Sequence, residues 1–455
     1  MVLRDWLKGL EYECIRGSLD TEVSEVVYDS RKAAPGAVFV CMAGTRVDSH
    51  RFVPDVLKAG VRVLVTERGI EEELGKAAEE SGLTEEELSR VTVLQTGDGR
   101  HALALLSAAR FDYPAAKMVT IGVTGTKGKT TTTHMIKAIL EAAGKKVGMI
   151  GTTGTVINGQ VTPTMNTTPE SYELHQSFAK MAEAGCQYMI MEVSSQGIKM
   201  HRVDGLAFDY GIFTNISPDH IGPDEHADFA EYLCCKSRLL SMCRIGLVNL
   251  NDGHFKEIVK DASCRLYTYR VKEDGETKAD FEASNVRYVS RPDFVGTEFD
   301  VKGRYEMDVR LGIPGLFNVD NALAAVSICS FLDLSKERIS HALEHVRVNG
   351  RMEIVHTSAR CTVLVDYAHN AVSMESLLST LRQYHPKRLV VVFGCGGNRS
   401  KERRYSMGEI GGRLADLSIV TADNSRFEKV EDIIADIRGS IEKTGGVFIE
   451  IPDRR

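Results

Sequence analysis

Short apolar runs alternate with amphipathic stretches along most of the chain, and this alternation predicts strands joined by helices. In the first 111 residues, GAVFVCMAG and VRVLVTE predict buried strands, whereas IEEELGKAAEESGLTEEELSR predicts a charged surface helix. Uninterrupted apolar runs of about four to eight residues are typical of strands covered on both faces. We therefore predict a first α/β domain over residues 1–111.

A second segment opens with the strand-like run MVTIGVTG, followed by the helical pattern THMIKAILEAAG, which ends at Gly144. The runs KVGMIGTTG, YMIMEVS, YGIFTNI and IGLVNLN then alternate with helical stretches, which predicts a parallel sheet with crossover helices. Residues 279–312 change to an alternating pattern that predicts antiparallel hairpins, and NVDNALAAVSICSFL predicts a helix. This segment is predicted to form a central domain over residues 112–348.

The last segment alternates again, with CTVLVDYA, RLVVVFGCGG, LSIVTAD and VFIEIP as strands and three helical patterns between them. It predicts a second open α/β sheet over residues 349–455. A chain of 455 residues is too long for one hydrophobic core, which agrees with a division into three domains.

Composition and charge narrow the function classes. The chain is 43% hydrophobic and 26% charged, with a net charge of −7 and no block of like charge, so we expect neither a nucleic-acid partner nor a membrane surface. Its start lacks the apolar core of a signal peptide, and no apolar run approaches the length of a membrane span. The ten cysteines are scattered without a CxxC pair, which is typical of reduced thiols. We expect a cytoplasmic monomer.

The stretch GVTGTKGKTTTT, residues 122–133, lies between a predicted strand and a predicted helix. Backbone N–H groups of such a glycine-rich turn, together with the helix N-terminus, form an anion site. Lys129 would reach the β- and γ-phosphates of a nucleotide, and the hydroxyl of Thr130 or Thr131 would serve Mg²⁺. The usual phosphate-loop pattern has glycine where this chain has Val123, and a plain strand–turn–helix is the alternative interpretation.

Three further groups follow predicted strands or occupy a predicted helix. Glu192 ends the strand in MEVSSQG, where a carboxylate suits Mg²⁺, although a solvated glutamate is an equally simple interpretation. Asp219 and His220 are predicted to end another strand. His226 and Lys236 are predicted to share a helix, where each would ordinarily be a structural or solvated residue.

Taken together, these motifs resemble the Mur ligase family. The resemblance rests on TGTKGKTT, NTTP, MEVSSQG, HRVDGLAFD, TNISPDH, LFNVDNALAA, GRME, VDYAHN, FGCGGNRSKERR and DNSRFE in one order, and extends back to YDSRKAAPGAVFV. It implies three domains, with a central P-loop-type sheet and a C-terminal Rossmann-like sheet. It also implies a ligase that uses ATP to phosphorylate the carboxylate of UDP-MurNAc-L-Ala-D-Glu, after which an amino group attacks the acyl phosphate.

The resemblance implies roles for individual residues. Those matching catalytic positions are Lys129, Glu192, His220 and Lys236. Those matching nucleotide contacts are Gly125, Thr126, Lys127, Gly128, Lys129, Thr130, Thr131, Asn318, Asn321, Arg351 and Asp366. Those matching Mg²⁺ ligands are Thr130, Glu192, His220 and Lys236, the last as a lysine carbamylated by CO₂, since a free ammonium cannot ligate a metal.

The same resemblance implies three groups of substrate contacts. Ser30 and Thr45 match the uridine-diphosphate site, and Thr167, Thr168, Ser194 and Arg202 match the muramoyl-peptide site. The incoming amino acid would meet Arg399, Asp423, Asn424 and Arg426. Arginine is the natural bidentate partner of a carboxylate, so Arg426 favours meso-diaminopimelate, a diamino acid with a distal carboxylate, over L-lysine.

Several positions depart from the family pattern. DNSR replaces DNPR, Gln196 replaces the usual histidine after EVSS, and Lys127 stands where relatives commonly have asparagine. The family's GKGHE region is absent, so we expect an incomplete C-terminal domain. The alternatives are a lysine-adding ligase, another Mur-type amide ligase, and a nucleotide-binding paralogue with impaired catalysis.

Overall fold

A computed structural model describes residues 1–44, 47–81, 83–222, 225–271, 278–291 and 294–454. The chain forms two compact units, one of Met1–Arg270 with Ala324–Leu334 and one of Val271–Leu323 with Ser335–Arg455. Each unit has buried clusters of its own. The three-domain division at residues 111 and 348 stays a prediction.

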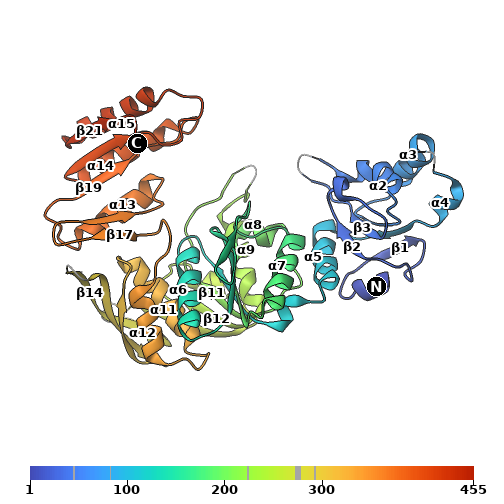
Figure 1. The fold of residues 1–455 in the computed structure, drawn as a ribbon, viewed down its shortest axis with the longest axis horizontal. Coiled ribbons are helices and arrows are strands. Elements are labelled where there is room, and N and C mark those ends of the chain that lie inside the picture. Colours follow the sequence, from blue (N-terminus) through green and yellow to red (C-terminus); the bar gives the residue numbers. More distant parts are fainter. Residues whose placement is uncertain (45–46, 82, 223–224, 272–277, 292–293, 455) are drawn as a thin grey trace. The chain divides into compact units, whose positions relative to one another are not determined.

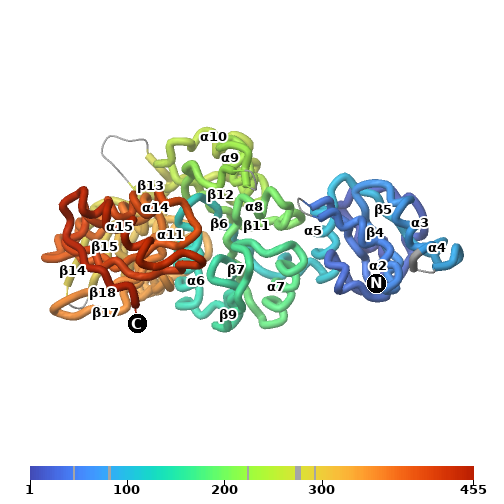
Figure 2. The backbone as a smooth tube through the Cα atoms, turned by 90° about the horizontal axis from the view of Figure 1, so that it is seen from above, coloured from blue at the N-terminus to red at the C-terminus, as the bar shows by residue number. Residues whose placement is uncertain are grey.

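The first unit begins with a five-stranded sheet in the order β1-β5-β4-β3-β2, in which β1 is antiparallel to β5 and the other pairs are parallel. Its strands are β1 (Glu13–Arg16), β2 (Glu25–Val27), β3 (Ala37–Val40), β4 (Val63–Thr66) and β5 (Thr92–Gln95), and its helices are α1 (Leu3–Trp6), α2 (Val53–Lys58), α3 (Glu71–Ser81), α4 (Glu85–Ser89) and α5 (Gly99–Arg110). The predicted strands β3 and β4 are buried throughout, as their apolar runs require. The charged stretch forms α3 and α4, which lie beyond β4 and β5, away from α5 (Figure 2).

The same unit contains most of a larger sheet, and its strands there follow the order β13-β12-β11-β6-β10-β7-β8-β9. The strands are β6 (Val119–Thr124), β7 (Val147–Gly151), β8 (Gly154–Ile157), β9 (Gln160–Thr162), β10 (Tyr188–Glu192), β11 (Phe208–Phe213), β12 (Cys243–Asn249) and β13 (Arg265–Val271). The six strands β7, β10, β6, β11, β12 and β13 are neighbours in this order and are all parallel, as the alternation of strands and helices predicts. Strands β8 and β9 continue the sheet beyond β7 as antiparallel strands. The carboxyl ends of β6, β10 and β11 therefore meet at one edge of the sheet.

Helices cover both faces of this sheet. The helices are α6 (Lys129–Ala142), α7 (Ser171–Glu183), α8 (Ser195–Lys199), α9 (Phe229–Ser237) and α10 (Phe255–Val259), and Figure 1 shows α6 and α7 on opposite sides of the strands. Leu174, Phe178 and Met181 of α7 pack with Met189 and Met191 of β10 in one buried cluster. None of the helices within the described ranges is both long and apolar enough to cross a membrane.

The second unit contains the predicted antiparallel hairpins and the second α/β sheet. Its elements are β14 (Phe281–Arg291), β15 (Phe294–Gly303), β16 (Met307–Leu311), α12 (Lys336–His345), β17 (Glu353–Thr357), β18 (Thr362–Val365), α13 (Ala371–Arg382), β19 (Val390–Phe393), α14 (Lys401–Leu414), β20 (Leu417–Thr421), α15 (Val430–Thr444) and β21 (Phe448–Ile451), and α11 (Leu316–Cys329) begins in it. Strands β14, β15 and β16 are antiparallel, and β19, β20 and β21 form a parallel sheet.

One predicted strand of the last segment pairs differently from our expectation. The CTVLVDYA run forms β18, which pairs with β17 in a separate two-stranded antiparallel sheet and does not join β19. Val363 and Val365 are 45% and 46% exposed, so this strand is not covered on both faces. An apolar run indicates a strand, but it does not specify the partner of that strand.

Candidate active site

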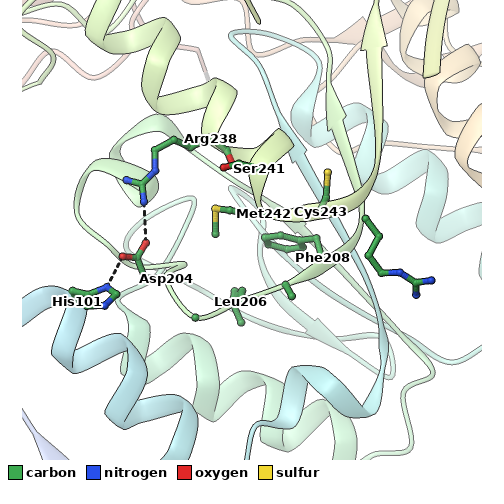
Figure 3. Close-up of a pocket in the computed structure, with 11 residues that line it drawn as sticks. His101, Asp204, Leu206, Phe208, Arg238, Ser241, Met242 and Cys243 are labelled. Atoms are coloured by element: carbon green, nitrogen blue, oxygen red, sulfur yellow. Dashed lines mark hydrogen bonds and ion pairs between the residues drawn. The ribbon is translucent and has the colours of Figure 1, made fainter. Parts of the chain in front are cut away.

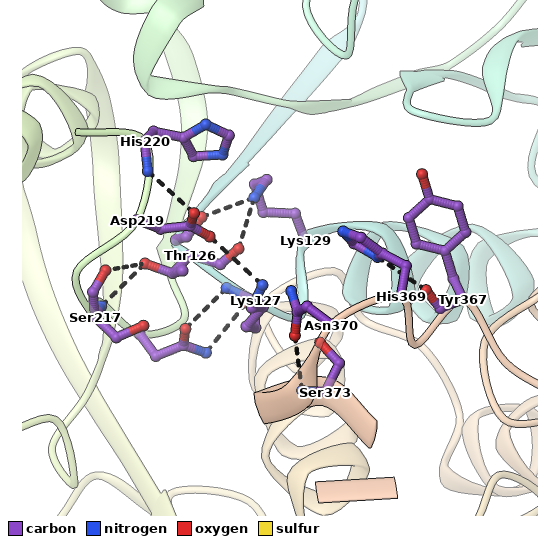
Figure 4. Close-up of polar contacts among 12 residues, drawn as sticks. Thr126, Lys127, Lys129, Ser217, Asp219, His220, Tyr367, His369, Asn370 and Ser373 are labelled. Atoms are coloured by element: carbon purple, nitrogen blue, oxygen red, sulfur yellow. Dashed lines mark hydrogen bonds and ion pairs between the residues drawn. The ribbon is translucent and has the colours of Figure 1, made fainter. Parts of the chain in front are cut away.

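The glycine-rich loop joins β6 to α6 and has the backbone shape of a phosphate loop. Gly125 has a φ of +139° and Gly128 a φ of +87°, which favour glycine. A side chain on Gly125 would also collide with the Thr214 hydroxyl. The Nζ of Lys129 folds back over this loop and donates to the carbonyl oxygens of Gly125 (2.8 Å) and Thr126 (3.1 Å), as Figure 4 shows. The lysine therefore lies at the mouth of the loop at the α6 N-terminus, where an anion is favoured.

Glu192 lies at the end of β10, beside the start of α6. Its side chain is buried, and both carboxylate oxygens accept a hydrogen bond from the Thr130 hydroxyl at 3.0 Å. The backbone N–H of Thr152 donates to Oε1 at 2.8 Å, and the Thr152 hydroxyl donates to Oε2 at 3.3 Å. Within the described residues these are neutral donors, and no lysine, arginine or histidine pairs with this carboxylate. A buried carboxylate held by neutral groups is a suitable ligand for a cation.

Lys236 lies in α9 and is only 2% exposed. Its Nζ donates to the Gly125 carbonyl at 2.9 Å, the same oxygen that Lys129 contacts, and lies 4.8 Å from the centre of the Tyr232 ring. Burial, assisted by the positive charge of Lys129, holds the pKa of the Lys236 amine well below its usual value. The structure thus brings together Lys129, Lys236 and the phosphate loop, and the lysine is not solvated.

Asp219 and His220 lie in the loop after β11 and not at the end of the strand, because β11 ends at Phe213. Asp219 contacts the Lys127 Nζ at 3.5 Å, which places this loop next to the phosphate loop (Figure 4). The exposed His220 has its Nδ1 2.8 Å from a carboxylate oxygen of Glu225. The expectation that His226 shares a helix with Lys236 is wrong, because Asp228 caps α9 and His226 precedes it.

The residues expected to contact the muramoyl peptide gather around the end of β10. The buried Thr168 hydroxyl donates to the Glu192 carbonyl oxygen and accepts from the Ser194 N–H. The Thr167 hydroxyl is 3.0 Å from that of Thr152. Arg202 donates to the Thr168 carbonyl at 3.0 Å and pairs with Glu170 at 2.6 Å. All four predicted residues therefore lie within one hydrogen-bonded region beside the Glu192 site.

The uridine-diphosphate contacts were expected in the first sheet. Ser30 begins a short 3-10 helix that Asp29 caps, and it is partly exposed. Thr45 lies outside the described residues. Arg31 contacts both carboxylate oxygens of Asp29 and holds the pKa of Asp29 at about 2. The Asp29 carboxylate also accepts from the Arg31 backbone N–H and so caps the turn that contains Ser30.

The second unit carries four residues expected to contact the nucleotide. Asn318 and Asn321 are buried in α11, where the Asn318 side chain donates to the Pro314 carbonyl and accepts from the Asn321 side chain. The Asp366 carboxylate accepts from the backbone N–H groups of Met352 and Ala368, both at 2.8 Å. The Arg351 guanidinium lies 4.7 Å from the centre of the Tyr367 ring. Arg351 and Asp366 thus belong to one local cluster, while Asn318 and Asn321 form another.

The expected acceptor residues lie in two adjoining loops of the second unit. Arg426 donates to the Gly397 carbonyl at 3.0 Å, and the Gly397 N–H donates to the Asn424 carbonyl at 2.9 Å. Arg399 is exposed in the first of these loops, as is Asp423 in the second. The structure therefore brings the FGCGGNRS and DNSR motifs together.

Comparison with known families adds to this geometry. The Mur ligase middle domain matches residues 123–329, the Mur ligase glutamate ligase domain matches residues 350–455, and the Mur ligase family catalytic domain matches residues 22–111. The chain belongs to the Mur ligase family.

Individual relatives in the Mur ligase family are similar over nearly the whole chain. The protein named UDP-N-acetylmuramoyl-L-alanyl-D-glutamate–2,6-diaminopimelate ligase of Caldanaerobacter subterraneus subsp. tengcongensis is 38% identical over 457 residues, which cover 100% of this chain and 89% of the relative. The protein of the same name from Clostridium perfringens is 38% identical over 441 residues, which cover 96% of this chain and 87% of the relative.

Solved structures of Mur ligases and related enzymes share the fold. A structure of a UDP-N-acetylmuramoyl-L-alanyl-D-glutamate–2,6-diaminopimelate ligase has a TM-score of 0.75 and 24% identity, covering 100% of this chain and 89% of its own. The structure of MurF ligase of Thermotoga maritima in complex with ADP has a TM-score of 0.57 and 18% identity, and the match covers 95% of this chain and 94% of the MurF chain. These likenesses show that the chain has the three-domain α/β fold of the Mur ligases.

Sequence reasoning missed three residues that shape this Mur ligase site. Tyr232 is fully buried and its hydroxyl lies 3.0 Å from the Thr126 hydroxyl. Asn215 holds both the N–H and the carbonyl of Lys127 through its side-chain amide. Thr152 supplies two of the donors to Glu192. The four-residue spacing of Tyr232 and Lys236 on one helix face was a usable signal for the tyrosine.

Proposed function

We propose that this chain is the ATP-dependent ligase that joins meso-diaminopimelate to UDP-N-acetylmuramoyl-L-Ala-D-Glu in the synthesis of peptidoglycan precursors. The observation that carries the proposal is the joint placement of Lys129, Lys236 and the Thr130–Glu192 pair around one phosphate loop. The names of the relatives support the choice of substrates.

The reaction is an amide ligation in two steps. A carboxylate oxygen of the dipeptide attacks the γ-phosphorus of ATP, and ADP leaves. The amino group of diaminopimelate then attacks the acyl carbon, loses a proton and displaces phosphate. Two anions must approach each other in the first step, so Lys129 and the loop N–H groups of Gly125–Thr131 serve to offset their repulsion.

The residues around Glu192 fit Mg²⁺. A buried carboxylate that has only neutral donors around it, next to a threonine hydroxyl at the start of α6, offers oxygen ligands in the environment that this ion prefers. Thr130 and Glu192 would hold the ion, with His220 and the modified Lys236 as further ligands. When bound, Mg²⁺ supplies positive charge to the phosphates of ATP.

Lys236 fits carbamylation by CO₂. Only a neutral amine attacks CO₂, forming an N–C bond and releasing a proton, and burial favours the neutral amine here. The product is an anion, which the neighbouring Lys129 would stabilise. We therefore infer that Lys236 carries a carbamate that serves as a metal ligand, and we expect this carbamate to be lost when CO₂ is removed.

Each remaining group of predicted residues would bind a different substrate. Ser30 and Thr45 would bind the uridine diphosphate, and Thr167, Thr168, Ser194 and Arg202 the peptide. Asn318, Asn321, Arg351 and Asp366 would bind the nucleotide. Arg399, Asp423, Asn424 and Arg426 would bind the amino acid, with Arg426 on its distal carboxylate.

The decisive experiment compares two amino-acid acceptors in the same ligase assay. The chain is incubated with ATP, Mg²⁺, UDP-N-acetylmuramoyl-L-Ala-D-Glu and either meso-diaminopimelate or L-lysine, and ADP and phosphate are measured. We expect turnover with diaminopimelate and little with lysine. Turnover with lysine alone would overturn the acceptor assignment, and nucleotide binding without turnover on either acceptor would favour a non-catalytic nucleotide-binding protein.

A substitution sharpens the acceptor test. Arg426→Ala should raise the KM for diaminopimelate by at least about 100-fold, because a charge-assisted bidentate contact is lost, and should leave the KM for ATP nearly unchanged. Arg413→Ala is the matched control, since Arg413 pairs with Glu375 on the surface of the same unit. An unchanged acceptor KM in Arg426→Ala would remove this arginine from the acceptor site.

A further inference from the structure

Two histidines and an aspartate converge at a place that the ligase reaction does not use. His101 lies in the first turn of α5, and His201 and Asp204 lie in the turn that follows α8. The Nδ1 atoms of His101 and His201 lie 2.8 Å and 2.7 Å from the same oxygen, Oδ2 of Asp204. One donor atom from each of the three residues lies within 4.8 Å of the others. Figure 3 shows His101 and Asp204 pointing toward each other.

A second layer of charged groups fixes the orientation of these three side chains. Asp98 lies 3.4 Å from the Nε2 of His201, the ring nitrogen that faces away from Asp204. Asp98 also caps α5 by accepting from the His101 N–H at 2.8 Å. A carboxylate on the far nitrogen of a histidine is the usual outer partner of a metal-ligating imidazole. Arg238 lies 3.6 Å from the other oxygen of Asp204, Oδ1, which leaves Oδ2 to the two imidazoles.

The site is accessible from solvent, and its donor atoms lie close enough together to share one ion. His101 and Asp204 line a hollow of about 390 Å³ that also contains Leu206, Phe208 and Arg238. The Asp204 side chain is 8% exposed, and those of His101 and His201 are 39% and 28% exposed. Tetrahedral zinc with bonds near 2.0 Å separates its donors by about 3.3 Å, so small side-chain movements would admit the ion.

We propose that His101, His201 and Asp204 form a binding site for a divalent transition metal of the zinc class, with a water molecule as the fourth ligand. Two imidazoles and one carboxylate suit Zn²⁺, whereas Mg²⁺ and Ca²⁺ prefer oxygen ligands alone. The site is separate from the Thr130–Glu192 site in its residues and in its ligand chemistry. Among the described residues, no other group of three histidine, cysteine or carboxylate side chains converges in this way.

The bound metal would join α5 to the turn after α8. That turn also carries Arg202, which holds the Thr168 carbonyl and Glu170. The metal therefore acts as a clamp that restrains the segment presenting Arg202, in the same way that other metal sites stabilise the folded state they bind.

The test measures metal binding by the full chain with a large excess of Mg²⁺ present, so that the oxygen-ligand site is saturated. We expect one equivalent of Zn²⁺ in isothermal titration calorimetry, and a tetrahedral visible spectrum when Co²⁺ replaces it. His101→Gln should weaken binding by more than about 100-fold, and Asp98→Asn, which keeps the helix cap, by about 10-fold. Zn²⁺ should raise the Tm of the parent chain and not that of His101→Gln.

The control addresses another pair of histidines. His341 and His345 stack at 4.5 Å on the surface of α12, and a pair spaced four residues apart on a helix can bind such metals. The double variant His341→Gln, His345→Gln should therefore retain the one-equivalent binding. Loss of binding in this control, or no binding by the parent chain, would overturn the proposal. Binding that is unchanged in both His101→Gln and Asp98→Asn would overturn it as well.

Discussion

Lys236 lies in an environment that a lysine rarely occupies. It is buried, it donates to a carbonyl oxygen, and a second lysine donates to the same oxygen. We expect Lys236→Ala to lower kcat by at least about 100-fold, because the proposed carbamate ligand of Mg²⁺ would be lost. A short carboxylic acid such as acetate should restore part of the activity, and kcat measured with and without it checks this.

A signal independent of activity tests the same residue. Parent protein equilibrated with ¹³C-bicarbonate should show a carbamate carbon resonance that Lys236→Ala lacks. Lys256→Ala, at an exposed lysine of α10, is the control and should keep both the resonance and the activity. A Lys236→Ala variant that retains parental activity would exclude the lysine from the reaction.

His175 predicts a pH dependence of stability. It is buried in α7, both of its ring nitrogens lack a hydrogen-bond partner within the described residues, and burial lowers its pKa to about 4. The unfolded chain takes up a proton below about pH 6.5 that the folded chain excludes until about pH 4. Folding is therefore destabilised progressively as the pH falls through this window, by roughly 3 kcal/mol at its acid end.

Substitution of His175 by leucine should remove this penalty. In urea unfolding at pH 8 and pH 5, His175→Leu should lose less stability on acidification than the parent chain does. His356→Leu, at an exposed histidine of β17, is the control and should lose as much stability between pH 8 and pH 5 as the parent chain does. Equal losses in the parent and in His175→Leu would contradict the burial argument.

Single residues were predictable where their chemistry depends on a local motif. Glu192 was placed at a strand end and Lys129 at a helix start because both positions follow from the run of apolar residues. The burial of Lys236 and the contacts of Thr152 were not predictable, since they depend on elements that are far apart in sequence. Val123 illustrates the difference. Val123 is fully buried within β6, which extends to Thr124. The strand therefore continues through the position at which the usual phosphate-loop pattern has its first glycine.

At the scale of elements, the contact between two loops of the second unit depends on Gly397 and not on the neighbouring Gly396. A Cβ on Gly397 would collide with the Ser425 carbonyl oxygen, whereas a Cβ on Gly396 would have an ordinary contact of 3.6 Å with the Asn424 carbonyl. Gly397→Ala should therefore displace the DNSR loop and raise the KM for diaminopimelate by about 10- to 100-fold, while the KM for ATP changes little. Steady-state kinetics with each substrate varied in turn measures the difference.

The neighbouring glycine provides the matched control for this loop. Gly396→Ala adds the same methyl group one residue earlier and should leave both KM values close to those of the parent. If the two variants behave alike, the contact between Gly397 and Ser425 does not position the acceptor loop.

The presence and type of elements with strong periodicity were predicted correctly. The start of one helix and the pairing partner of one strand were not. The strands β6, β10 and β11 and the helix α6 follow from apolar runs and from the glycine at position 144. The start of α9 was missed because the cap at Asp228 competes with several other polar residues before it. The pairing of β18 with β17 was missed because a run of valines fits a sheet edge as well as a sheet centre.

At the scale of the whole molecule, the order of the motifs was more informative than any one of them. Each motif alone had a simple structural explanation, yet together they indicated the family that the comparisons confirm. The domain limits, the monomeric state and the cytoplasmic location stay predictions. They depend on contacts and surroundings that patterns along one chain do not specify.

At the scale of the whole first unit, two tyrosine–glutamate hydrogen bonds link the first sheet to the start of α7. The Tyr28 hydroxyl donates to both carboxylate oxygens of Glu173 at 2.9 and 3.0 Å, and the Tyr172 hydroxyl donates to Glu25 at 3.1 Å. Each bond to a carboxylate is worth about 1.5–3 kcal/mol. The double variant Tyr28→Phe, Tyr172→Phe keeps the ring packing and should lower the free energy of unfolding by roughly 3 kcal/mol or more.

The same variant tests whether these contacts hold in place the segment that we propose to bind uridine diphosphate. The KM for UDP-N-acetylmuramoyl-L-Ala-D-Glu should rise, because Ser30 follows Tyr28 closely, while the KM for ATP should change much less. Tyr113→Phe, at a partly exposed tyrosine in the turn after α5, is the control and should match the parent in urea unfolding and in both KM values. A double variant with parental stability and parental KM values would show that the two glutamates do not join these segments. A fall in stability with equal increases in both KM values would indicate a general loss of folded protein instead of a local displacement.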